Sequence, residues 1–137
     1  IPLAVSGAFH SPLMEEAGRE MRKVLQKLDW RNPTFPVYCN VNGRAVSDRL
    51  SLQDIMQEQI TSPVLWIDTI ENMRRAGINF WLEAGPKAVV GKMAPSILEA
   101  MSKNNENASE QDVAAPKILA VTNLAQAEGL IAESQGG

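Results

Sequence analysis

The sequence has few of the residues that build disulfides, metal sites and aromatic cores. Its 137 residues include 1 cysteine, 1 histidine and 1 tyrosine, and aromatic residues make up 5% of the chain. A single cysteine excludes an intrachain disulfide, and with a single histidine it also excludes a His/Cys zinc cluster within the chain. No apolar run approaches the roughly 20 residues that a membrane span needs. We therefore expect no stapled scaffold, no metal site and no membrane span.

An excess of one charge is also missing. Lysine and arginine come to 13 and aspartate and glutamate to 16, which gives a net charge of −3. This balance is too even for a protein that binds nucleic acid electrostatically. Apolar residues make up 45% of the chain against 21% charged residues. The composition thus indicates one folded domain of ordinary size and no nucleic-acid partner.

The first residues of the sequence are apolar. The chain opens with the apolar run IPLAV (residues 1–5), without an initiator methionine or a basic stretch. No targeting peptide is visible, so a cytoplasmic location is expected. Residues 1–5 are typical of a buried strand that ends in a turn at Ser6-Gly7. We interpret the chain as the C-terminal fragment of a longer protein.

A long amphipathic helix is predicted after this turn. Ser11 can cap it, Pro12 suits its first position, and Asn32-Pro33 ends it. Apolar residues recur at steps of three and four and predict one buried face, formed by Leu13, Ala17, Met21, Val24, Leu25 and Leu28.

Strands and helices alternate along the rest of the chain. Strands are predicted over 36–41, 78–82 and 118–121, with a turn at Asn42-Gly43. One helix is predicted from the Ser51/Asp54 capping box to about Ile60, and a second from Ser62-Pro63 to Gly77. A third is predicted over about 87–101 with a break at Pro95, and a last one begins at the Asn123/Gln126 cap. Residues 102–116 are expected to form a flexible loop. This alternation predicts an α/β architecture with a mainly parallel sheet.

The single histidine, His10, lies in the strand-to-helix turn GAFHSP (residues 7–12). Such a turn places a side chain at the carboxyl edge of a sheet, where open α/β folds have their sites. The positive end of the following helix favours a neutral imidazole, which is the form that a general base requires. His10 is therefore a candidate base, although a lone histidine can also have a structural role.

The residues alone offer no clear nucleophile for this base. The Ser11 hydroxyl is better used on the backbone of the helix that it caps, and no serine lies in a Gly-x-Ser-x-Gly turn. Cys39 lies in an apolar strand, where a cysteine is usually a small buried residue with a raised pKa. A Cys39–His10 pair is therefore disfavoured, and the residues amount to half an active site.

Four motifs follow one another at compatible spacings within roughly residues 3–101. They read GAFHSPLM (7–14), PVYCNV with a glycine after it (36–43), QITSPVLW (59–66) and, after Met73 and Gly77, FWLEAGP (80–86). Together they resemble the malonyl-CoA:acyl-carrier-protein transacylases. Any one motif is weakly specific, whereas four in the family's order are strongly specific.

The resemblance implies a ping-pong reaction of fatty-acid biosynthesis that needs no cofactor. In the family, a serine in a GHSxGE turn takes the malonyl group from malonyl-CoA, and the group then passes to the phosphopantetheine thiol of acyl carrier protein. His10 corresponds to the base of this reaction. The family's serine, its oxyanion-hole segment and its malonyl-binding arginine lie upstream of the region that Ile1 begins. The chain alone is therefore expected to be inactive.

The resemblance also gives roles to two residues beside the base. The main-chain carbonyl of Gln59 corresponds to the group that orients the histidine where other enzymes use a carboxylate. The alternative for Gln59 is a solvated or capping amide at a helix end. In the family, a phenylalanine at the position of Phe9 is found in enzymes that use malonyl rather than α-methyl-branched donors. A phenyl ring that faces the α-carbon of the donor would leave no room for a branch. The alternative for Phe9 is packing against the sheet edge.

The implied fold is an α/β-hydrolase-like large subdomain with an inserted ferredoxin-like small subdomain. Residues 1–9 would end the small subdomain, and residues 10–137 would complete the large one. Four basic residues either face the acidic carrier protein or form a solvated surface: Arg74, Arg75, Lys87 and Lys92.

One position departs from the family. Lys87 stands where the family commonly has a glycine, so the local turn is expected to differ. Acyltransferase domains of polyketide synthases vary at this position too, so such a domain is an alternative function. A non-catalytic α/β interaction module, in which His10 and Gln59 are structural, is another.

Overall fold

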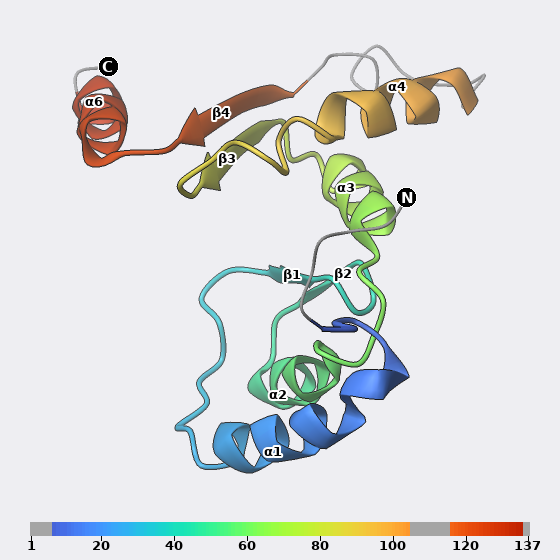
Figure 1. The fold of residues 1–137 in the computed structure, drawn as a ribbon. Helices are drawn as coiled ribbons and strands as arrows, with labels where there is room; N and C mark the ends of the chain where they lie inside the picture. The colour runs from blue at the N-terminus through green and yellow to red at the C-terminus, as the bar shows by residue number, and fades with distance from the viewer. Residues whose placement is uncertain (1–6, 105–115, 136–137) are drawn as a thin grey trace. The chain divides into compact units, whose positions relative to one another are not determined.

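The computed structural model describes residues 7–104 and 116–135. The chain divides into two compact units, Ile1–Asn72 and Met73–Gly137 (Figure 1). The strand predicted over 1–5 and most of the loop predicted over 102–116 lie outside the described residues. Within the described parts, no helix is long and apolar enough to cross a membrane.

The first unit begins with a 3₁₀ turn, η1 (Pro12–Met14), that leads into α1 (Glu15–Leu25). Ser11 caps η1, because its Oγ accepts a hydrogen bond from the Leu13 N–H at 3.3 Å. The predicted cap residue is thus confirmed for this turn, whereas α1 itself begins three residues later than predicted, after Met14, whose side chain makes no cap bond. The predicted end at Asn32-Pro33 is wrong. The indole N–H of Trp30 donates to the Leu25 carbonyl at 2.7 Å and satisfies the last turn, so the helix ends seven residues earlier.

The predicted buried face of α1 is only partly buried. Gly18 and Leu25 are buried on the side of α1 that packs against α2 (Arg49–Glu58). Leu13 and Val24, by contrast, are 83% and 57% exposed. The apolar spacing fixes which side chains share a stripe, whereas burial needs a second surface, and the described residues cover only one edge of this stripe.

A β-hairpin follows, made of β1 (Val37–Cys39) and β2 (Arg44–Val46). The strands are antiparallel, with Tyr38 opposite Ala45, so the prediction of a mainly parallel sheet is wrong here and β2 was not predicted. Gly43 turns the chain at a φ of 64°, and a Cβ there would lie 2.7 Å from the Cβ of Asp68. Asn42-Gly43 is the strongest short hairpin signal, which makes β2 foreseeable.

Two helices follow the hairpin, the second of which continues into the second unit, and both begin at other residues than predicted. The cap of α2 is Asp48 rather than Ser51: the Asp48 carboxylate accepts from the Ser51 N–H at 2.9 Å, and this bond lowers the pKa of Asp48. The helix α3 (Trp66–Arg75) starts after Ser62-Pro63, because the Leu65 N–H donates to the Asn40 carbonyl at 2.8 Å before the helix begins.

The second unit contains the parallel strands β3 (Phe80–Ala84) and β4 (Lys117–Val121), with Trp81 opposite Ile118. This pair confirms the predicted parallel connection, although β3 begins two residues later than expected. As predicted, Gly77 ends α3, with a φ of 80°. Trp81 is buried, and its indole N–H donates to the Ile78 carbonyl at 3.0 Å.

The helices of the second unit are α4 (Ala94–Asn104) and α6 (Leu124–Gln135). The predicted break at Pro95 is wrong, because Pro95 is the second residue of α4, where a missing N–H costs nothing. The predicted cap of the last helix is confirmed: the Asn123 side chain accepts from the Gln126 N–H at 3.0 Å.

A carboxylate fixes the turn between β3 and α4. Glu83 Oε1 accepts from the N–H groups of Val89 and Val90, both at 2.9 Å, and Oε2 accepts from the Gly91 N–H at 2.7 Å. These three bonds lower the pKa of Glu83. His10 is the only described non-glycine residue with a positive φ, so Lys87 has an ordinary backbone angle in this turn.

Replacing Glu83 should destabilise the protein in a pH-dependent way. Glu83→Gln leaves one acceptor oxygen for three N–H groups, so the melting temperature should fall at pH 7. Because the folded-state pKa is lowered, the stabilisation is complete above the ordinary carboxyl pKa and is lost as the pH falls through the lowered value. The difference in melting temperature between the parent chain and Glu83→Gln should therefore be largest near neutral pH. It should disappear in strong acid.

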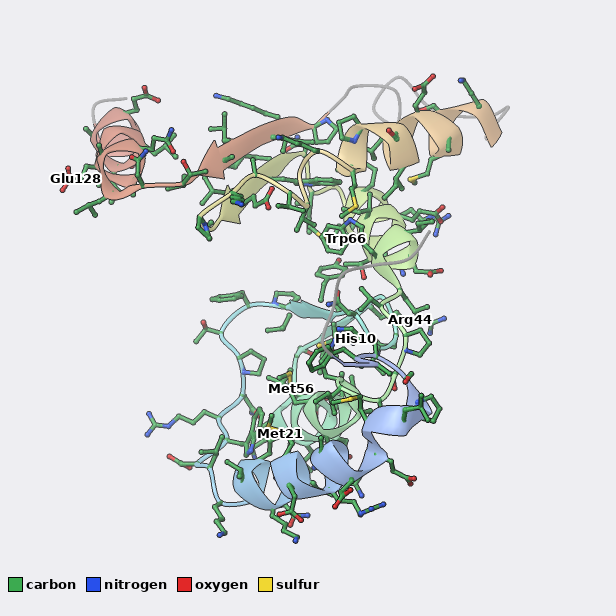
Figure 2. All side chains as sticks on the ribbon, in the orientation of Figure 1. His10, Met21, Arg44, Met56, Trp66 and Glu128 are labelled. Carbon is green, nitrogen blue, oxygen red and sulfur yellow. The ribbon has the colours of Figure 1, made fainter. Side chains whose placement is uncertain are left out.

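The matched control is Glu128→Gln on the exposed side of α6, where the described residues provide no hydrogen-bond partner (Figure 2). Its melting temperature should follow that of the parent chain at every pH. Equal effects of the two substitutions, or a Glu83→Gln effect independent of pH, would contradict the assigned role of the carboxylate.

Candidate active site

His10 is held in an unusual backbone conformation at the start of the first unit. Its φ is 60°, in the left-handed region that a non-glycine residue rarely adopts. Two hydrogen bonds hold it there. The His10 N–H donates to the Ile60 carbonyl at 2.9 Å, and the ring Nδ1 lies 3.0 Å from the Gln59 carbonyl oxygen. Strained residues that surrounding contacts fix in this way concentrate at functional sites.

The second bond decides where the ring proton lies. A carbonyl oxygen can only accept, so Nδ1 carries the proton and donates to Gln59. In the neutral ring, Nε2 then has a free lone pair. The residue is exposed in this chain (labelled in Figure 2), so Nε2 is accessible to a reacting group. This is the tautomer and exposure that a general base needs.

Both carbonyls come from the C-terminal end of α2. The Glu58 carbonyl already accepts from the N–H groups of Thr61 and Ser62 and from the Thr61 hydroxyl, at 3.0–3.1 Å. The next two carbonyls, of Gln59 and Ile60, are turned to His10. Because the C-terminal end of a helix carries partial negative charge, the ring's N–H side faces a negative potential without a carboxylate.

The structure thus brings two of the predicted site residues, His10 and Gln59, together. Gln59 makes the contact through its main-chain carbonyl, and the described residues give its side-chain amide no hydrogen bond. The contribution of Ile60 was missed. No signal in the sequence marks it, because the bond depends on the positive φ of His10 rather than on the identity of residue 60.

Phe9, the third predicted site residue, lies beside the base and is 52% exposed. Its ring lies against Gly7, where an added Cβ would come within 3.2 Å of Phe9 Cε2. This contact gives the ring a fixed neighbour within the turn. A role in selecting the donor stays a prediction.

The two alternative nucleophiles are engaged elsewhere. The Ser11 hydroxyl donates to the Ala8 carbonyl at 2.7 Å and accepts from the Leu13 N–H, so it serves the backbone as expected. The Cys39 thiol is buried in β1 and lies 3.9 Å from the Val37 carbonyl oxygen. Burial raises the pKa of Cys39, which disfavours the thiolate.

The four basic residues expected either to face the carrier protein or to form a solvated surface all lie in the second unit. Arg74 and Arg75 are in the last turn of α3, while Lys87 and Lys92 are exposed in the turn that Glu83 holds. Lys92 also contributes to the lowered pKa of Glu83. Their contact with a carrier protein stays a prediction.

Comparison with known proteins gives the chain its relatives. No family model matches it. It is 34% identical over 97 residues to the malonyl CoA-acyl carrier protein transacylase of Staphylococcus aureus, and 31% identical over 97 residues to the protein of the same name from Bacillus subtilis. Each match takes in 71% of this chain and 32% or 31% of the relative. The chain therefore spans about a third of the length of these relatives.

Solved structures agree with these sequence matches. An acyl carrier protein S-malonyltransferase from Vibrio cholerae is 28% identical, with a TM-score of 0.77 over 95% of this chain and 38% of that one. A malonyl-transacylase in complex with a type II polyketide synthase acyl-carrier protein is 25% identical, with a TM-score of 0.77 over 97% of this chain and 38% of that one.

The chain is related to one part of the malonyl-CoA:acyl-carrier-protein transacylases. The resemblance of the four motifs is thereby confirmed, and so is the α/β class. The 97 matched residues agree in length with the predicted span of roughly 3–101. The two named relatives are matched over about a third of their length, so their activity is not assigned to this chain on similarity alone.

Cys39 should behave as a buried core residue rather than a nucleophile. It is the only thiol, and the residue is 6% exposed. In the folded chain it should react with an aromatic disulfide reagent at pH 8 on the order of a hundredfold more slowly than in guanidinium, because reaction requires local opening. Equal rates in the two conditions would show an accessible thiol and reopen the Cys39–His10 alternative.

Proposed function

We propose that this chain supplies the general base of a malonyl-CoA:acyl-carrier-protein transacylase. The observation that carries the proposal is the geometry of His10, whose Nδ1 donates to the Gln59 carbonyl and whose Nε2 is free and accessible. The relatives, named as malonyl CoA-acyl carrier protein transacylases, supply the reaction class. The nucleophilic serine lies outside these 137 residues, so the isolated chain is inactive.

His10 moves one proton in each half of the reaction. First, Nε2 takes the proton of the serine hydroxyl as the serine oxygen attacks the thioester carbonyl of malonyl-CoA. The C–S bond then breaks, and the coenzyme A thiolate leaves with the proton from the imidazolium. In the second half, the phosphopantetheine thiol of the carrier gives its proton to Nε2 and attacks the malonyl ester. The serine oxygen leaves and recovers the proton.

The end of α2 stabilises the charged ring that forms in each half. The imidazolium keeps its Nδ1–H bond to Gln59, and that bond strengthens as the ring becomes positive. The partial negative charge of the helix terminus acts in the same direction. These two effects take the place of the aspartate of a Ser-His-Asp triad, which both orients the ring and stabilises its charge.

Further parts of the proposal follow from the family. Residues 1–9 end a ferredoxin-like small subdomain and residues 10–137 complete an α/β-hydrolase-like large subdomain. Phe9 faces the α-carbon of the donor and excludes branched donors. Malonyl-CoA and acyl carrier protein are the substrates, and the reaction takes place in the cytoplasm. Arg74, Arg75, Lys87 and Lys92 either face the acidic carrier protein or form a solvated surface.

The carrier protein can belong to a fatty-acid or a polyketide pathway. One solved relative is a malonyl-transacylase bound to a type II polyketide synthase acyl-carrier protein. The chemistry at His10 is the same in both cases. Transfer rates to one carrier of each type, measured with the full-length polypeptide, distinguish the two.

Removing the base should abolish most of the activity of the full-length polypeptide, expressed with its upstream coding sequence. His10→Asn suits the test, because asparagine tolerates the left-handed backbone and can donate to Gln59 but cannot take a proton. Malonyl transfer from malonyl-CoA to carrier should fall by at least about a hundredfold, with little change in substrate binding. Near-normal turnover would assign His10 a structural role and reject the proposed function.

The role of the Gln59 main chain predicts a contrast between two changes. Gln59→Ala keeps the carbonyl and should lower the transfer rate modestly, by about tenfold. Insertion of one residue between Gln59 and Pro63 should move the carbonyl and approach the loss seen in His10→Asn. Circular dichroism checks that both variants fold. A loss in Gln59→Ala as large as that of the base variant would show that the side-chain amide carries the role.

A further inference from the structure

We infer that Gly18 is a positioning residue for His10, because it lets the Thr61 methyl group pack against the backbone of α1 and so sets the distance from the ring to the Gln59 carbonyl. The inference deepens the proposed function and rests on it. Gly18 has no polar side chain and contacts no reacting atom, so it would act only through the placement of other groups.

Gly18 lies where α1 packs against the residues that follow α2. It is buried in the middle of α1. A Cβ added there would lie 3.1 Å from Thr61 Cγ2 and 3.5 Å from Ile60 Cγ2. The first distance is shorter than ordinary carbon–carbon contact, so any side chain at residue 18 would push Thr61 away by a few tenths of an ångström.

Thr61 can yield by rotating its side chain only if it gives up a hydrogen bond. Its hydroxyl donates to the Glu58 carbonyl at 3.1 Å, and its N–H donates to the same oxygen at 3.1 Å. Turning the methyl group away from α1 would break the hydroxyl bond. A push on the methyl is therefore passed to the backbone at the end of α2.

That backbone carries the two carbonyls that hold the base. Ile60 and Gln59 directly precede Thr61, and they accept from the N–H and Nδ1 of His10 at 2.9 and 3.0 Å. His10 and Gly18 themselves belong to one continuous segment of chain that runs through η1. Within this segment the Ser11 hydroxyl bonds to both the Ala8 carbonyl and the Leu13 N–H. The two stretches meet at His10 and at Gly18, so a wider gap at Gly18 changes the bond at His10.

Two helical glycines allow a matched experiment. Gly18→Ala adds a methyl group against Thr61, whereas Gly129→Ala adds the same group in α6 with nothing within 4 Å. Alanine favours the helix at both positions, so only the contact differs. Thr61→Ser, made in the Gly18→Ala background, removes Cγ2 while keeping the hydroxyl that bonds to Glu58. It should relieve the contact and rescue the site.

The first readout uses the 137-residue chain and does not depend on activity. With one histidine in the sequence, long-range ¹H–¹⁵N spectra of the imidazole report a single ring. The parent chain should show the Nδ1-protonated tautomer. Gly18→Ala should move the Nδ1–H proton resonance upfield as the bond to Gln59 lengthens, Gly129→Ala should leave it in place, and Thr61→Ser should restore it.

The second readout is steady-state malonyl transfer by the full-length polypeptide. Gly18→Ala should lower kcat by about tenfold with KM nearly unchanged, because the base is misplaced while the substrate contacts remain. Thr61→Ser should recover most of this loss. A merely structural role would lower the active fraction and would not move the His10 resonance of the folded chain.

Several outcomes overturn the inference. One is that Gly18→Ala and Gly129→Ala have the same His10 resonance and the same kcat. Another is that Thr61→Ser, added to Gly18→Ala, restores neither. If Gly18→Ala does not fold, Thr61→Ser in the parent chain tests the same contact from the other side: it removes the Cγ2 that packs against Gly18 and keeps the hydroxyl on Glu58, and an unchanged His10 resonance then rejects the inference. Normal transfer by His10→Asn would instead reject the proposed function, so the two failures are distinguishable.

Discussion

The bonds between His10 and the end of α2 are the constraint on which the candidate site depends. The backbone N–H and the ring Nδ1 of one residue meet two successive carbonyls, of Ile60 and Gln59. Two bonds in different directions fix both the backbone and the ring, and they hold a left-handed φ of 60° that the residue would otherwise avoid. The same two stretches of chain also come together at Gly18, where an added Cβ would lie 3.1 Å from Thr61 Cγ2.

In both units, hydrogen bonds between a side chain and unpaired backbone groups fix a local structure. In the first, carbonyls that a helix end leaves without intrahelical partners hold a side chain. In the second, the Glu83 side chain holds three backbone N–H groups of a turn that has no regular structure. Each unmatched backbone group needs a partner, and both sites satisfy that need with a side chain that is thereby fixed in position. A base that must present one ring nitrogen benefits directly from such an arrangement.

Local signals in the sequence predicted the elements whose ends they determine. The Ser11 cap, the Gly77 helix end and the Asn123 cap are correct because each depends on bonds within a few residues. Predictions that needed a distant partner were less accurate. The α1 stripe is only partly buried because the described residues cover one edge of it. The helix α3 starts late because Leu65 bonds to Asn40 of the hairpin instead.

The sequence by itself determined the α/β class, the relationship to the transacylases and the identity of the candidate base, since it contains one histidine, placed in a predicted strand-to-helix turn. The motifs also pointed to Gln59, through resemblance rather than through any local pattern. Only the tertiary structure decided which atoms meet. The bond from His10 to Gln59 spans 49 positions and joins a residue with a positive φ to the end of α2. Such a bond depends on how two elements pack, and packing distance is not encoded in the spacing of either element alone.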